Sequence, residues 1–246
     1  MSIESQADLQ HLLEVGRIVA RAIQAMQAAC RPGITTGELD EVGGAVLAEA
    51  GAQAAPRLVY GFPGIACISC NDEAAHGIPG ARVIQSGDLV KIDVTAERDG
   101  YFADAAVTVP VGPVSAREQK LIAAARAALD AAVAAAQAGS PLARIGTAAE
   151  AVARARGFTV VRELCGHGVG RAIHEEPQVP NIATHVRGTL TEGLVLAVEP
   201  HLTTGTGRIR TAPDGWTLRT TDGRPVANFE HTIVITKGRP LLVTAA

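Results

Sequence analysis

Residues 31–51, RPGITTGELDEVGGAVLAEAG, indicate the fold, because residues 137–157, QAGSPLARIGTAAEAVARARG, are a weak copy of them. In each copy a turn-forming stretch precedes apolar residues at helical spacing, and a glycine follows them. We therefore expect an α+β domain of two pseudo-twofold halves, each with two helices and antiparallel strands, whose strands converge between the halves. A shift of 106 residues places Gly33 on Gly139, Leu39 on Ile145, Val46 on Val152 and Gly51 on Gly157.

Four helices are expected around this repeat. Apolar periodicity predicts the first over about residues 8–27 and the fourth over about residues 143–156. The second and third begin at Thr-x-x-Glu and Ser-x-x-Glu capping boxes, at Thr35 and Ser115, and the third is expected to end near residues 139–141. Strand-like sequence dominates from the second helix to about Val111. The length of 246 residues suits a single domain, residues 1–246.

Composition limits the class of protein. Hydrophobic residues make up 47% of the chain, charged residues 19%, and the net charge is -3, which argues against a nucleic-acid substrate. The first residues lack a signal-peptide pattern, and the most apolar helical stretch, residues 121–138, is interrupted by charges. We expect a cytoplasmic protein that does not span a membrane. The Cys67-x-x-Cys70 spacing has no second metal-binding pair, so we expect buried, reduced cysteines.

Four carboxylates and one histidine lie in five segments whose local contexts fit a site for two metal ions. They are Asp93 in GDLVKIDV, Asp104 in DGYFADAAVTV, His167 in ELCGHGVG, Glu199 in EGLVLAVEP and Glu230 in ANFEHTIVI. Two divalent cations would neutralise the four carboxylates, whereas without cations a buried cluster of them would be strongly repulsive. One nitrogen and several oxygens suit manganese, iron(II), cobalt or zinc, and the sequence does not choose among these metals.

The two aspartates flank a predicted turn at residues 97–100. They are symmetric about its centre, so we expect them to be directly opposed cross-strand partners with Cβ atoms about 4.5–5.5 Å apart. Ile92 and Val94 would then face the core on the other side of the sheet. Two cations held by such a site lower the pKa of a bridging water, polarise a carbonyl and anchor an amine. This chemistry suits hydrolysis of an amide near a free amino terminus.

The histidines are harder to assign. His167 and His174 are seven residues apart, and on one extended strand an odd spacing sends side chains to opposite faces. We therefore expect one to bind metal and the other to reach the substrate, unless Gly170 marks a bulge. His76 is either a surface histidine or part of the site. His11, His185 and His201 are interpreted as structural or solvated.

The sequence resembles methionine aminopeptidase of type I, in the short bacterial form, over nearly its whole length. The resemblance rests on NDEAAHGIP (71–79), CGHGVGRAIHEEPQVPN (165–181) and FEHTIVIT (229–236), supported by RPGITTGELD (31–40) and DGWTLRT (214–220). It implies the two-halved pita-bread α+β fold and an enzyme that removes the initiator methionine from nascent polypeptides, preferring a small second residue. It also implies attack by a bridging hydroxide in a dinuclear metal site and a monomer. Transient ribosome association is left open.

The resemblance also implies residue roles. Asp93 would chelate one metal ion, Asp104 and Glu230 would bridge both, and His167 and Glu199 would complete the other, with Glu199 also carrying the proton. His76 would contact the scissile amide nitrogen and His174 the substrate carbonyl. The pocket for the methionine side chain would include Phe62, Cys67 and Trp216. The chain departs from the family pattern at Ile173, and at Val59 and Pro56 on the approach to this pocket.

Two other functions remain open. An Xaa-Pro aminopeptidase or prolidase would share the fold and the metal ligands, but such relatives normally carry a large additional amino-terminal domain, and only about 70 residues precede NDEAAHGIP here. A non-catalytic binding protein on the same fold would be expected to have lost ligands, whereas all five are present.

Overall fold

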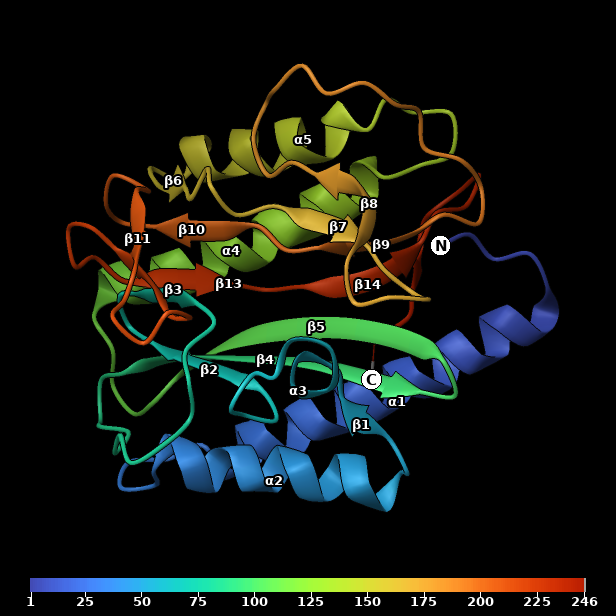
Figure 1. Cartoon of the computed structure of the whole chain (residues 1–246). Helices are drawn as coiled ribbons and strands as arrows, with labels where there is room; N and C mark the ends of the chain where they lie inside the picture. Colours follow the sequence, from blue (N-terminus) through green and yellow to red (C-terminus); the bar gives the residue numbers. More distant parts are fainter. Residues whose placement is uncertain (246) are drawn as a thin grey trace.

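The computed structural model describes residues 1–245, in which two pairs of helices enclose the strands (Figure 1). The first pair, α1 and α2, covers one side, and the second pair, α4 and α5, covers the other, while the short α3 lies among the strands (Figure 1). The bounds of the helices are α1 Gln6–Ala29, α2 Thr36–Glu49, α3 Ala55–Tyr60, α4 Ala116–Ala135 and α5 Ala143–Ala155.

Within these described residues the strands form four sheets, and all their pairings are antiparallel. In a four-stranded sheet, β1 (Gln53–Ala54), β4 (Leu89–Arg98) and β2 (Cys67–Cys70) follow one another, and β5 (Tyr101–Pro110) pairs with β4. A five-stranded sheet has the order β15 (Leu241–Leu242), β14 (His231–Val234), β9 (Val195–Val198), β7 (Gly166–Gly168) and β8 (Glu175–Val179). Two small sheets contain β13 (Val226–Asn228), β10 (His201–Thr203) and β6 (Thr159–Val160), and β11 (Ile209–Thr211), β12 (Leu218–Thr220) and β3 (Glu73–Ala75).

The predicted repeat is confirmed. A shift of 106 residues places the last residue of α1 on the last residue of α4, and the last residue of α2 on the last residue of α5. It also places β4 on β9 and β10 together. Gly33 and Gly139 both adopt the left-handed conformation, with φ of +94° and +83°, as do Gly51 and Gly157. The two halves therefore share turn geometry as well as element order.

The predicted capping boxes at Thr35 and Ser115 are present at the starts of α2 and α4. Helix α4 ends at Ala135, earlier than expected, because the next residues bond to other segments: Ala138 N–H donates to the Thr236 carbonyl and Gly139 N–H to the Leu190 carbonyl. The short helix α3 was not predicted, since its six residues are too few to show periodicity. No helix within residues 1–245 combines the length and apolar character needed to cross a membrane.

The β4–β5 hairpin differs from the prediction in its register. The turn residues are Asp99 and Gly100, with φ of +54° and +78°, so the centre of the hairpin lies one residue later than expected. Asp-Gly is a favoured pair for such a two-residue turn, which requires positive φ at both positions. Asp104 consequently pairs with Thr95, and Asp93 pairs with Ala106. The prediction of directly opposed aspartates is wrong: they are diagonal neighbours on one face.

Side chains and main-chain groups join the two halves where β5 meets the second half. The Thr232 hydroxyl accepts a hydrogen bond from Asp104 N–H (2.9 Å) and donates one to the Asp104 carbonyl (2.8 Å). Glu230 N–H donates directly to the Ala106 carbonyl at 2.9 Å. The Thr108 hydroxyl bonds in the same two-way manner to the main chain of Asn228. This seam fixes the spacing of the strands that carry the site.

Candidate metal centre and active site

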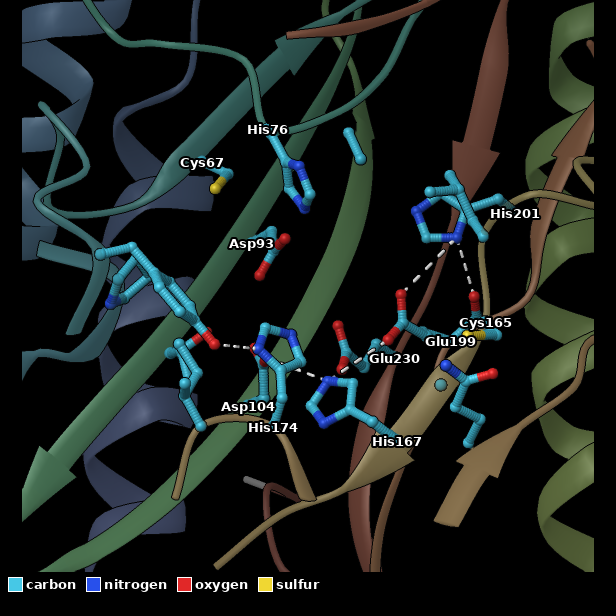
Figure 2. Close-up of a pocket in the computed structure, with 18 of the residues that line it drawn as sticks. Cys67, His76, Asp93, Asp104, Cys165, His167, His174, Glu199, His201 and Glu230 are labelled. Carbon is cyan, nitrogen blue, oxygen red and sulfur yellow. Dashed lines mark hydrogen bonds and ion pairs between the residues drawn. The ribbon is translucent and has the colours of Figure 1, made fainter. Parts of the chain in front are cut away.

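The residues predicted to form the site line one cavity of about 720 Å³ between the halves (Figure 2). The first half contributes the β4–β5 hairpin and the segment around β2 and β3, and the second half contributes β7 and the residues next to β9 and β14. The ten residues are Phe62, Cys67, His76, Asp93, Asp104, His167, His174, Glu199, Trp216 and Glu230.

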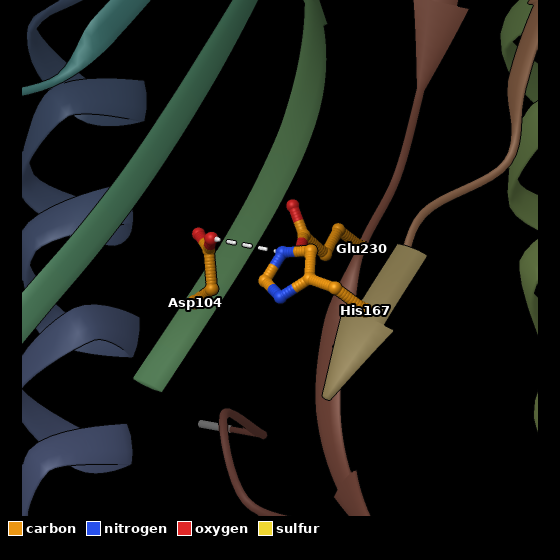
Figure 3. Close-up of side chains that lie close together, drawn as sticks. All are labelled: Asp104, His167 and Glu230. Atoms are coloured by element: carbon orange, nitrogen blue, oxygen red, sulfur yellow. Dashed lines mark ion pairs between the residues drawn. The ribbon is translucent and has the colours of Figure 1, made fainter. Parts of the chain in front are cut away.

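Three of these side chains form the tightest group of potential metal ligands (Figure 3). Asp104 on β5, His167 on β7 and Glu230 just before β14 each offer one ligand atom, and these atoms lie within 4.8 Å of one another. His167 Nε2 is 4.0 Å from Asp104 Oδ2 and 3.5 Å from Glu199 Oε1. Strands from both halves therefore meet at His167.

A hydrogen bond to the main chain orients the His167 ring. Its Nδ1 lies 2.9 Å from the Gly168 carbonyl oxygen, which can only accept, so Nδ1 carries the proton. The lone pair of Nε2 then faces the carboxylates of Asp104 and Glu199. Burial lowers the pKa of His167 to about 4, and the ring is neutral at pH 7. A neutral imidazole held in this way is the form that binds a metal ion.

The surroundings of the four carboxylates disfavour their ionised forms. Burial, followed by the charge of neighbouring carboxylates, raises the pKa of Asp104, Glu199 and Glu230 well above its ordinary value. Burial also raises the pKa of Asp93 to about 6, although this side chain is partly open to the cavity. Asp104 Oδ1 and Glu230 Oε1 are buried and have no hydrogen-bond partner among residues 1–245. A divalent cation would satisfy these oxygens and remove the repulsion, so the residues fit a metal centre.

His174 reaches the same cavity as His167, and the two ring centroids are only 4.3 Å apart (Figure 2). The prediction for one extended strand, with the two side chains pointing apart, is wrong, because the chain turns back between β7 and β8; the alternative left open, that the chain changes direction around Gly170, applies instead. Gly170 in this turn has a φ of +133°. His174 is not part of the tight group of potential ligands, and burial lowers its pKa.

His76 lines the cavity and is exposed to it, and the protein around its ring lowers its pKa by partial burial. Its backbone is left-handed, with a φ of +55°, a conformation that costs energy for a residue with a Cβ atom. The following Gly77 packs so closely on β2 that a Cβ atom there would lie 2.3 Å from the Ile68 carbonyl oxygen. His76 is thus an exposed residue that also lines the cavity, and its role in the site stays a prediction.

Part of the cavity lining is apolar. The rings of Phe62 and Trp216 meet edge to face with centroids 5.3 Å apart. Cys67 lies in the same lining, and burial raises the pKa of its thiol well above the ordinary value, so it stays protonated. Pro56 and Ile173 also line the cavity, whereas Val59 is 45% exposed on α3. Cys67 and Cys70 are free and buried, as expected, whereas Cys30 and Cys165 are free but only half-buried.

Sequence reasoning missed two residues of the cavity wall and one behind it. His201, interpreted as structural or solvated, is buried in the wall, and its Nδ1 lies 2.8 Å from the Glu199 carbonyl. The two-residue spacing from Glu199 was the available signal, because alternate residues of an extended chain share a face. Asn181 donates to the carbonyls of Leu164 (3.2 Å) and Glu199 (3.1 Å). Tyr60 lines the cavity from α3, which no sequence pattern revealed.

The sequence matches the model of a protein family described as metallopeptidase family M24 over residues 10–237. It is 42% identical to methionine aminopeptidase 2 of Bacillus subtilis over 99% of both chains. It is also 42% identical to a methionine aminopeptidase of Staphylococcus epidermidis, over 99% of this chain and 98% of that relative.

Solved structures agree with these sequence matches. A crystal structure of methionine aminopeptidase from Thermotoga maritima has a TM-score of 0.97 and 32% identity, covering 100% of both chains. The prolidase of Pyrococcus furiosus has a TM-score of 0.79 and 21% identity, covering 99% of this chain and 65% of its own, which is a likeness of fold alone. The expected two-halved α+β fold is confirmed.

Proposed function

Because the chain belongs to metallopeptidase family M24, we propose that it is a methionyl aminopeptidase, which removes the initiator methionine from nascent polypeptides and prefers a small second residue. Matches at 42% identity to relatives named methionine aminopeptidase, over almost the full length of both chains, support this activity. The observation that carries the proposal is a cavity in which buried, unpartnered carboxylate oxygens lie beside a neutral His167, with an apolar wall in the same space.

The proposed metal centre holds two divalent ions, of manganese, iron(II), cobalt or zinc. Asp93 would chelate one ion, Asp104 and Glu230 would bridge both, and His167 and Glu199 would complete the other. The four raised carboxylate pKa values and the unpartnered oxygens of Asp104 and Glu230 support this ligand set. When bound, two such ions supply a water of lowered pKa and polarise the scissile carbonyl.

The protein groups around the centre have distinct proposed roles. Glu199, whose pKa is raised by burial, takes a proton from the attacking water and delivers it to the leaving amine. His76 contacts the scissile amide nitrogen, and His174 contacts the substrate carbonyl. Phe62, Cys67 and Trp216 bind the methionine side chain, for which an apolar wall containing a thiol and two aromatic rings is suited.

The remaining features of the proposal concern the setting of the reaction. The catalytic domain would span residues 1–246 and act as a monomer in the cytoplasm on the amino termini of nascent chains that begin with methionine. Transient contact with the ribosome would bring it to these substrates. A nucleic-acid substrate is disfavoured by the net charge of -3.

The prolidase-like alternative has weaker support. The likeness to the Pyrococcus furiosus prolidase is at 21% identity, so it supports a shared fold and no shared substrate. The non-catalytic alternative is disfavoured because all five candidate ligands and both additional histidines line one cavity.

The test is release of free methionine from the peptides Met-Ala-Ser and Met-Leu-Ser by metal-stripped protein, with manganese, cobalt, iron(II) or zinc added back. Metal-dependent cleavage of the first peptide but not the second is expected. Glu199→Gln should lower turnover by at least about 100-fold because the proton carrier is lost. Glu163→Gln removes an equal charge from an exposed position at the same cavity and should leave turnover within about twofold of wild type. Stoichiometric metal binding without cleavage of either peptide would contradict the proposal.

A further inference from the structure

Tyr60 makes a short hydrogen bond to one of the cavity histidines. Its hydroxyl oxygen lies 2.7 Å from His174 Nδ1, and the two ring centroids are 5.7 Å apart. The Tyr60 side chain is 47% exposed, so burial alone does not hold the ring against His174. The hydrogen bond is therefore the specific contact between them.

The local backbone holds Tyr60 in place. It is the last residue of α3, and Gly61 follows in the left-handed conformation with a φ of +69°. Gly61 N–H donates to the Arg57 carbonyl (3.1 Å), and Arg57 Nη2 donates to the Pro63 carbonyl (2.8 Å). The next side chain, Phe62, is buried against Trp216. A closed turn with an anchored neighbour thus presents the phenol to His174.

Chemistry determines the direction of the hydrogen bond. A phenol is a good donor and a weak acceptor, whereas the unprotonated nitrogen of a neutral imidazole is a good acceptor. At pH 7 and above, an imidazole of ordinary pKa is mostly neutral and a phenol keeps its proton. Tyr60 accordingly donates to Nδ1, and the single proton of the His174 ring lies on Nε2.

The two adjacent imidazoles therefore have opposite tautomers. His167 carries its proton on Nδ1, because that atom faces the Gly168 carbonyl, and its Nε2 offers a lone pair. His174 carries its proton on Nε2, because its Nδ1 accepts from Tyr60. A ring nitrogen with a lone pair can bind a metal ion, and one with a proton can donate a hydrogen bond. The ring centroids are only 4.3 Å apart, yet these two contacts give the rings different abilities. His167 can bind a metal ion, and His174 can donate a hydrogen bond.

We propose that Tyr60 is a positioning residue that holds His174 in the Nε2–H tautomer, so that this histidine donates a hydrogen bond to the substrate carbonyl and does not bind metal. The identity of that substrate rests on the proposed function. The tautomer of His174 does not, because it follows from contacts present in the protein alone.

The first experiment reads the tautomers directly. Metal-free protein labelled with ¹⁵N-histidine is examined by NMR at neutral pH, where an unprotonated ring nitrogen resonates far downfield of a protonated one. His174→Gln identifies the His174 signals by their loss. The expected result is a proton on Nε2 of His174 in the wild type and a mixture of tautomers in Tyr60→Phe. A proton on Nδ1 in the wild type, or a tautomer unchanged in Tyr60→Phe, would overturn the proposal.

The second experiment measures the effect on catalysis. Tyr60→Phe should lower kcat for Met-Ala-Ser by about three- to tenfold, the loss expected for one neutral hydrogen bond. KM should change little, because the carbonyl oxygen gains most of its charge in the transition state. Leu58→Ala, a 50% exposed residue of the same helix, is the matched control and should retain full kcat.

These outcomes separate the two proposals. A wild type that cleaves no peptide with any metal contradicts the proposed function and leaves the NMR result standing. A wild type that cleaves Met-Ala-Ser while Tyr60→Phe keeps full kcat contradicts the role of Tyr60 alone.

Discussion

Replacing Thr232 by valine should loosen the junction of the two halves beside the metal centre. Its side chain is buried, and its hydroxyl is bonded to both the N–H and the carbonyl of Asp104. Valine has nearly the same shape but no hydroxyl, so both main-chain groups of Asp104 would lose their partner. Within residues 1–245, β4 is the only strand that forms a ladder with β5, so no ladder bond on the other edge of β5 can replace the lost bonds.

The size of the effect follows from two buried polar groups left unpaired. Each costs about 1–3 kcal/mol, so Thr232→Val should lower the free energy of unfolding by about 2–6 kcal/mol. Thr232→Ser is the matched control, because it keeps the hydroxyl and loses one buried methyl group, at a cost of about 1 kcal/mol. The serine variant should therefore be the more stable of the two.

Urea denaturation of the metal-free proteins gives the free energies, and metal titration gives the second measure. Asp104 is a proposed bridging ligand, so Thr232→Val should also bind metal more weakly than Thr232→Ser. Equal stability of the valine and serine variants would refute the argument that this hydroxyl joins the halves.

Two further predictions concern other buried groups. Burial lowers the pKa of His231 to about 4 from an ordinary 6.5. The contribution of the neutral His231 ring to the free energy of unfolding is therefore fully present above pH 6.5 and is lost as the pH falls to about 4. Wild type should lose up to about 3 kcal/mol more stability than His231→Gln between pH 7 and pH 4, and equal losses on denaturation would contradict this. Asn181→Ala removes the donor to the carbonyls of Leu164 and Glu199. The free energy of unfolding should fall by about 1–3 kcal/mol, and kcat should fall because Glu199 is displaced. Unchanged denaturation and unchanged turnover would exclude this role of Asn181.

Local signals in the sequence predicted local structure well. The capping boxes at Thr35 and Ser115 each depend on a few neighbouring residues, and both are present. The internal repeat was also visible in the sequence, where a shift of 106 residues places Gly33 on Gly139. These two glycines have the same left-handed conformation at equivalent helix-to-helix turns. The residue types needed for a metal site were identified as well, since carboxylates in strand-like sequence are conspicuous.

Relative positions were harder to predict. The register of Asp93 and Asp104 depended on one turn, and counting from the middle of residues 97–100 missed the preference of Asp99-Gly100 for positive φ. The spacing of His167 and His174 was read along a single strand, although the chain reverses between them. Both errors concern the path of the chain between two residues.

The contact of Tyr60 with His174 had no sequence signal at all. The two residues are separated by 114 positions and lie in different halves. Helix α3 is too short for periodicity to reveal which side faces the cavity. Contacts of this kind depend on how the halves meet, and only the folded arrangement specifies them.

The metal centre and the junction of the halves are parts of one structure. Asp104 and Glu230, which come from different halves, both use main-chain groups in the seam: Asp104 bonds to Thr232, and Glu230 N–H donates to the Ala106 carbonyl. Their side chains meanwhile leave buried oxygens in the cavity that no group in the described part of the chain bonds. A cation held between these side chains would add a bond across the same seam that their main chains already span. Metal binding should therefore stabilise the association of the halves as well as provide the chemistry, since a ligand that binds only the folded state stabilises it.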